Sequence, residues 1–167
     1  MSTRRRAREL VLRALYAVEL SQNPLSQVIK KQFKKRGDDD PIYDFCVALT
    51  KKTFANYQEF DSMIKKKALN WDFDRIAVID RIILRMAMCE FIYFDDIPPK
   101  VSIDEAIEIS KKFSTEKSGK FINGILDSVL NEWNQENKIN KKGRGLVDIR
   151  KRKNEQIDTI VSNNHIV

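Results

Sequence analysis

Apolar residues recur along most of the chain at intervals of three and four positions, which is the spacing of one face of an α-helix. Residues 5–20 carry the clearest stripe, and Asn23-Pro24 ends it. A second helix is predicted from Leu25 to Phe33. No stretch of useful length alternates as a strand does, and no internal repeat is visible. The pattern therefore predicts an all-α protein.

The middle of the chain continues this pattern. The run from Asp38 to Pro41 suits a helix start, because acids and proline are favoured in the first turn. The helix that follows is predicted to extend to Tyr57, and a further stretch covers Phe60 to Leu69. Residues 73–94 are apolar on nearly all sides, which predicts a central helix.

Two more helices complete the predicted core. Ser102 and Glu105 have the spacing of a capping box, in which the serine caps the helix and the glutamate bonds back to its first residue. That helix is predicted to end at Phe113. The last one carries its apolar stripe from Phe121 to Trp133, which gives about seven helices in all.

Composition changes after Trp133. We predict a helical domain over residues 1–135 and a basic, flexible extension over 136–167. Within the extension, residues 136–145 are typical of a linker, 146–161 have a few apolar positions that could form a weak helix, and 162–167 are expected to be disordered.

The positive charge lies at the two ends of the chain. The 167 residues carry a formal net charge of +7. Residues 1–8 hold four arginines and no acid, residues 138–153 hold eight basic residues against Asp148 alone, and the part between is nearly neutral. Such clusters suit a polyanionic partner, through phosphate neutralisation and counterion release. A simpler interpretation, that basic ends only keep the protein in solution, stays open.

Several classes of protein are disfavoured. The sequence has no glycine-rich phosphate loop, no HExxH and no nucleophile elbow, and its one histidine is His165, near the C-terminus. Cys46 and Cys89 lack metal-ligand spacing and are expected to be buried reduced thiols. We therefore expect a binding protein that is not an enzyme and needs no cofactor or metal.

A membrane location is also disfavoured. No apolar run approaches the roughly 20 residues that span a bilayer. The basic start is similar to that of a signal peptide, but Glu9, Arg13 and Glu19 interrupt the apolar segment that a signal peptide needs. We expect a cytoplasmic protein.

Three sequence blocks occur in order between residues 4 and 133. The first begins at Arg4 and ends at Leu15-Tyr16, and the second runs from Arg81 to Ala87 with Glu90 after it. The third joins residues 101–106 to residues 120–127. Together these blocks resemble the NusB family of transcription antitermination factors.

The resemblance implies an all-α fold of two packed helical bundles. It also implies binding of the boxA element of nascent ribosomal RNA, jointly with the ribosomal protein NusE, in an RNA polymerase complex that suppresses termination. Some relatives pair through the face that binds RNA, so a homodimer is a further expectation. Arg13 stands where the family often has glutamine, which adds charge to the helix that faces RNA.

The arginine cluster supplies the first candidate RNA contacts. Guanidinium groups offer a planar fork that suits phosphates, and they stack on bases. Cations at a helix N-terminus oppose the helix dipole, which makes a purely structural role less favoured. The residues predicted to contact RNA on this helix are Arg4, Arg5, Arg6, Arg8 and Arg13.

The remaining candidates lie further along the chain. Tyr16 shares a helix face with Arg5, where it could stack an unpaired base or, equally, pack on a neighbouring helix. By resemblance, the turn before the last helix borders the RNA groove, although its phenylalanines are more often core residues. Asp80 is a candidate for a protein interface. The predicted RNA contacts here are Tyr16, Phe113, Lys117, Ser118, Lys120 and Phe121.

Two other functions are kept as alternatives. A NusB-like domain also guides ribosomal RNA cytosine methyltransferases, which need a following Rossmann-like domain with a catalytic cysteine. A helical adaptor for another protein could use the basic tail electrostatically. Arginine replacement at the start of the chain, compared with deletion of the tail, separates the adaptor from the RNA-binding factor.

Overall fold

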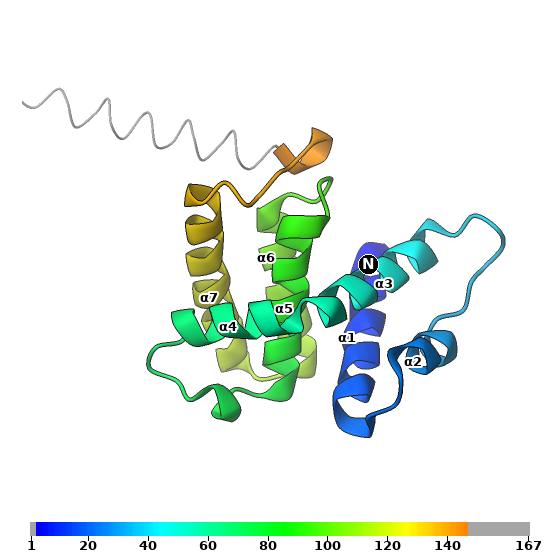
Figure 1. Cartoon of the computed structure of the whole chain (residues 1–167), viewed down its shortest axis with the longest axis horizontal. Coiled ribbons are helices and arrows are strands. Elements are labelled where there is room, and N and C mark those ends of the chain that lie inside the picture. Colours follow the sequence, from blue (N-terminus) through cyan, green and yellow to red (C-terminus); the bar gives the residue numbers. More distant parts are fainter. Residues whose placement is uncertain (1–2, 147–167) are drawn as a thin grey trace, which may run out of the picture.

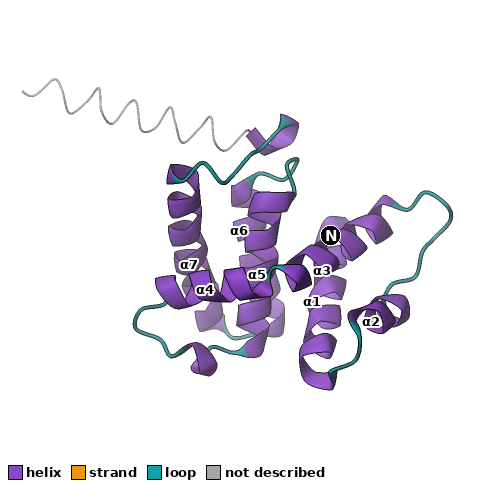
Figure 2. Cartoon of the chain, viewed as in Figure 1, coloured by secondary structure: helices purple, strands orange, loops and turns teal. Residues whose placement is uncertain are grey.

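The computed structural model describes residues 3–146, and all regular secondary structure within that range is helical (Figures 1 and 2). The prediction of an all-α protein with about seven helices is confirmed. The elements are α1 (Thr3–Ser21), α2 (Leu25–Gln32), α3 (Pro41–Ala55), α4 (Tyr57–Lys67), the 3-10 helix η1 (Phe73–Arg75), α5 (Val78–Tyr93), α6 (Pro99–Phe113), α7 (Glu116–Gln135) and the 3-10 helix η2 (Gly143–Leu146).

The helices form two bundles that meet along α5. In the first bundle α1 packs against α2 and α3, and in the second α4, α5, α6 and α7 pack together (Figure 1). Helix α5 also contacts α1 and α3, so it is shared by both. Every residue from Ile82 to Phe91 is buried, as expected for a helix that is apolar nearly all round.

The predicted capping box is wrong. Helix α6 begins at Pro99, with Pro98 in the cap position, so Ser102 lies inside the helix. The Ser102 hydroxyl is buried and donates to Glu90, while Glu105 accepts from Arg5. A serine and a glutamate three residues apart can cap a helix, but here both make tertiary contacts.

The segment after α7 differs from the flexible linker that we predicted. Lys141 is only 6% exposed, and its ammonium donates to the carbonyls of Glu90 and Phe94 at 2.8 and 2.7 Å. The Lys142 amide donates to the Asp95 carbonyl, against which Gly145 packs so closely that a Cβ would collide with it. We call residues 138–146 the docked segment. The predicted weak helix beyond Leu146 and the predicted disordered end lie outside the described residues.

Candidate nucleic-acid interface

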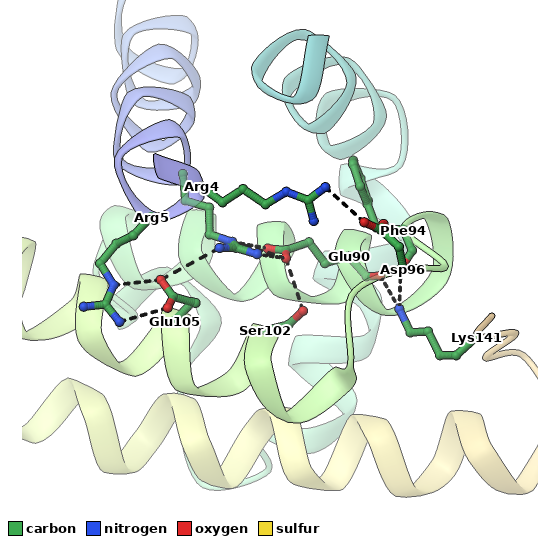
Figure 3. A network of polar contacts seen from close by, with 9 residues as sticks. Arg4, Arg5, Glu90, Phe94, Asp96, Ser102, Glu105 and Lys141 are labelled. Atoms are coloured by element: carbon green, nitrogen blue, oxygen red, sulfur yellow. Dashed lines mark hydrogen bonds and ion pairs between the residues drawn. The ribbon is translucent and has the colours of Figure 1, made fainter. Parts of the chain in front are cut away.

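A buried ion pair lies beneath the start of α1. The Arg8 guanidinium donates to both oxygens of Glu90, at 2.9 and 2.6 Å, and the two residues are 3% and 2% exposed. Burial opposes the charge on Arg8, but the charge and hydrogen bonds of Glu90 prevail and raise the pKa of Arg8 above its ordinary value. Ser102 and Lys141 approach Glu90 from α6 and the docked segment (Figure 3). We call Arg8, Glu90, Ser102 and Lys141 the Glu90 hub.

Two further arginines of the motif are also paired with carboxylates. Arg5 donates through Nε and a terminal nitrogen to Glu105 at 2.8 and 2.9 Å, and its pKa is raised by these hydrogen bonds (Figure 3). Arg4 pairs with Asp96 at 3.0 Å and lies over the ring of Phe45. Both pairs remain partly open to solvent, unlike that of Arg8.

The arginines of α1, which the sequence analysis grouped together, therefore differ in exposure and in pairing. Arg8 offers almost no surface to an RNA strand, and reaching a phosphate would require breaking its pair with Glu90. Arg6 is exposed, and within the described residues its side chain makes no ion pair. Arg13 is also exposed, and its guanidinium stacks on Phe113 with 5.6 Å to the ring centroid.

A surface of cations and aromatic rings continues from Arg13 to the turn between α6 and α7. Tyr16 is 37% exposed one turn further along α1, so it is not fully packed in the core. Lys117 and Lys120 are exposed at the start of α7, and within residues 3–146 neither forms an ion pair. Glu9, which faces the same side of α1, is neutralised by Lys112 at 2.7 Å.

A pocket of about 220 Å³ lies at this turn. Phe121 lines it together with Trp71, and the two rings meet edge to face at 5.6 Å between centroids. Arg75 and Lys117 line the pocket with their basic side chains. Trp71 is 62% exposed although tryptophan is usually well buried, and neither it nor Arg75 was selected from the sequence. The sequence feature that could have identified both residues as surface candidates is that they lie outside any apolar stripe.

A hydrogen bond between Ser118 and Asp80 joins the α6–α7 turn to α5. Ser118 is buried and donates to one Asp80 oxygen at 2.8 Å, so its hydroxyl is not free for a phosphate. The other Asp80 oxygen is buried without a hydrogen-bond partner in the described part of the chain. Asp80 also lines the pocket of Trp71 and Phe121, so it lies beside the predicted RNA contacts rather than on a separate face.

Other kinds of site find little support. Cys46 and Cys89 are buried free thiols, as predicted, and burial raises their pKa values to about 11 and about 12. Among residues 3–146 no group of three His, Cys, Asp or Glu side chains could hold a metal ion. In the same range no helix has both the length and the apolar character that crossing a membrane requires.

Comparison with known proteins gives a consistent picture. The NusB family matches residues 5–131. The chain is 45% identical over 148 residues to the transcription antitermination protein NusB of Salinibacter ruber, which covers 88% of this chain and 92% of that protein. It is 43% identical over 148 residues to the NusB protein of Chloroherpeton thalassium, covering 88% of this chain and 70% of that protein.

Solved structures agree with these sequence relatives. A structure of T. maritima NusB superimposes with a TM-score of 0.72 at 35% identity, covering 79% of this chain and 93% of that one. A chain from the crystal structure of antitermination factors NusB and NusE in complex with dsRNA gives a TM-score of 0.69 at 26% identity, covering 79% and 98%.

Proposed function

Because the chain belongs to the NusB family, we propose that it acts in transcription antitermination by binding boxA RNA together with the ribosomal protein NusE. The structural relative that contains both NusE and RNA supports these partners. The proposal depends most on one observation, which is the series of unpaired cations and accessible aromatic rings from Arg13 to the pocket of Trp71.

We call this surface the RNA track. Single-stranded RNA is recognised by cations that follow its backbone and by aromatic faces on which unpaired bases stack. The track supplies both, since Lys117 and Lys120 are free for phosphates and Trp71 is open for a base. Its residues are Arg13, Tyr16, Trp71, Phe113, Lys117, Lys120 and Phe121.

The paired residues serve this surface indirectly. Arg4, Arg5 and Arg8 hold α1 against α5, α6 and the loop between them, which fixes the position of Arg13 relative to Phe113. Ser118 joins the α6–α7 turn to Asp80.

This function requires no catalytic group and no cofactor from the chain. We propose that it acts in the cytoplasm, on transcripts as they leave RNA polymerase in an antitermination complex. A homodimer that covered the RNA track would compete with RNA, so sedimentation with and without boxA RNA tests that expectation. The methyltransferase alternative predicts methyl transfer from S-adenosylmethionine, which an assay with ribosomal RNA would detect.

The test is fluorescence-anisotropy titration of the full chain with boxA RNA and with a scrambled RNA of equal length, at one salt concentration, with and without NusE. We expect tighter binding of boxA RNA and a further gain when NusE is present. Equal affinity for the two RNAs that NusE does not change would contradict the proposal and favour the adaptor.

A further inference from the structure

We propose a second RNA-binding site, in the groove between α1 and the connection from α2 to α3. The inference rests on the proposed function, because it extends the path of the same RNA. The groove has a volume of about 400 Å³. Arg6, Lys34 and Arg36 line it with basic side chains, and Leu10, Phe33 and Tyr43 line it with apolar and aromatic ones. We call it the basic groove.

The cations of the basic groove are exposed and form no ion pairs among the described residues. They are Arg6, Lys34 and Arg36. The arginines beside Arg6 are all paired, which makes it the exception within its own motif. Residues 30–36 add to the charge, because five of these seven residues are basic and none is acidic. Three unpaired cations around one concavity favour an anionic ligand.

The nearest acid does not cancel this charge by direct pairing. Asp40 lines the groove, but its two oxygens accept from the backbone amides of Tyr43 and Arg36, at 3.1 and 2.8 Å. These backbone hydrogen bonds lower the pKa of Asp40, which caps α3, and the charge of Arg36 makes a smaller contribution in the same direction. Asp38 and Asp39 precede it in the chain and do not line the groove.

The apolar residues of the groove point to a nucleic acid rather than to an isolated phosphate. Phe33 is 6% exposed and packs in the core, whereas Leu10 and Tyr43 are only partly buried, so their side chains can be reached from the groove. A single strand repeats a phosphate and a base at every nucleotide, and the groove offers cations beside an accessible aromatic ring. An unpaired stretch of RNA therefore matches both of its features.

The basic groove and the RNA track each include an arginine on the same edge of α1. Seven residues separate Arg6 from Arg13, which at about 100° per residue places them on nearly the same edge of α1, about 10 Å apart along its axis. Both are exposed. A strand bound at Arg13 and Phe113 can follow this edge towards the N-terminus of α1 and reach the groove at Arg6. The groove then holds nucleotides that flank the boxA element.

The experiment compares boxA RNA alone with boxA RNA extended by about six uridines at its 5′ end, and separately at its 3′ end, a length within the site size of small single-strand binders. Dissociation constants are measured for the full chain over a range of salt concentrations. The test variant is Lys34→Gln/Arg36→Gln. The control variant, Lys51→Gln/Lys65→Gln, removes two exposed lysines that do not line the groove.

We expect one of the two extensions to steepen the salt dependence of binding, by about 0.7 in the log–log slope for each phosphate contacted. For the test variant, the log–log slope should be smaller than that of the wild type by about 1.4 on the extended RNA and nearly the same on boxA RNA alone. The control variant should show the wild-type slope on both RNAs. A 4-thiouridine in the extension should cross-link to the peptide that contains Tyr43.

Other results overturn the proposal. It is wrong if neither extension changes the slope, if the test variant weakens both RNAs equally, or if the control variant has the same effect as the test variant. Failure of the proposed function is measured separately, on boxA RNA alone, because the proposal assigns the groove to nucleotides outside boxA. Equal binding of boxA and scrambled RNA would refute that function, and this proposal with it.

Discussion

The Glu90 hub and the basic groove use the same residue types in opposite ways. Arg8 and Arg6 are two positions apart on α1, but Arg8 is 3% exposed in the hub and Arg6 lies on the open rim of the groove. Lys141 and Lys142 differ in the same way, because Lys141 is buried on two carbonyls while the side chain of Lys142 is 81% exposed. The position of each cation, rather than its type, decides what it does.

The difference follows from the cost of removing a charge from water. A buried cation must be compensated by a carboxylate or by carbonyl dipoles, and such groups then hold the fold together. An exposed cation without a partner keeps its hydration and is available to a phosphate. The formal net charge therefore overestimates the number of cations available to RNA phosphates, since Arg4, Arg5 and Arg8 are already paired with carboxylates.

The largest expected effect is on stability, from Arg8→Ala. Removing Arg8 leaves the buried Glu90 carboxylate without its main partner, and breaking such a pair costs about 3–5 kcal/mol of the free energy of unfolding. Urea denaturation followed by circular dichroism measures it. Arg6→Ala is the control, and we expect it to change stability by no more than about 0.5 kcal/mol.

A second variant distinguishes the contribution of the ion pair to stability from that of packing in the Glu90 hub. Arg8→Met/Glu90→Leu removes both partners and fills the space with apolar side chains. We expect this double variant to be more stable than Arg8→Ala, because the Glu90 carboxylate is no longer buried without its partner, while Lys141 keeps its two carbonyl acceptors. Equal destabilisation by the two variants would show that the ion pair is not what matters there.

The next effect concerns the docked segment. Lys141→Met removes two hydrogen bonds from the end of α5, and hydrogen bonds to charged groups contribute about 1.5–3 kcal/mol. Urea denaturation at pH 7 should show a loss of this order. Lys142→Met removes the same charge from an exposed side chain, so a comparable loss in that variant would contradict the account.

Trp71→Ala tests the RNA track. Stacking of a base on an aromatic ring contributes about 1–3 kcal/mol to binding, so the affinity for boxA RNA should fall roughly 5- to 150-fold. Because Trp71 is 62% exposed, the urea midpoint should change little. A variant with unchanged affinity would remove Trp71 from the interface.

A further effect concerns the pH dependence of stability. Burial lowers the pKa of Lys141 to about 8 from its ordinary value of 10.5, with the carboxylates of Glu90, Asp95 and Asp96 opposing the shift. Between those values the unfolded chain binds more protons than the folded one, so the contribution of Lys141 to stability rises with pH. The wild-type stability relative to Lys141→Met should therefore increase from pH 7 to pH 9.5, and a decrease would contradict the assignment.

The sequence predicted the fold well because apolar spacing fixes which face of each helix is buried. It also singled out the α1 arginines and the α6–α7 turn as candidates, and the structure places Arg13 on Phe113 and brings Lys117 and Phe121 to one pocket. It did not distinguish Arg8 from Arg6, since that depends on Glu90, which is 82 residues away from Arg8. For the same reason it missed Lys141, whose acceptors are backbone carbonyls with no signature in the sequence.

The central claim is that the free cations bind RNA while the paired ones hold the fold, and the salt dependence of boxA binding tests it most directly. Arg6→Gln/Arg13→Gln removes two free cations, whereas Arg5→Gln/Glu105→Gln removes a pair and leaves the net charge unchanged. The account predicts that the log–log slope falls by about 1.4 for the first variant, measured on boxA RNA with flanking uridines, and stays the same for the second. Equal slopes for the two variants, or a larger loss for the second, would contradict it.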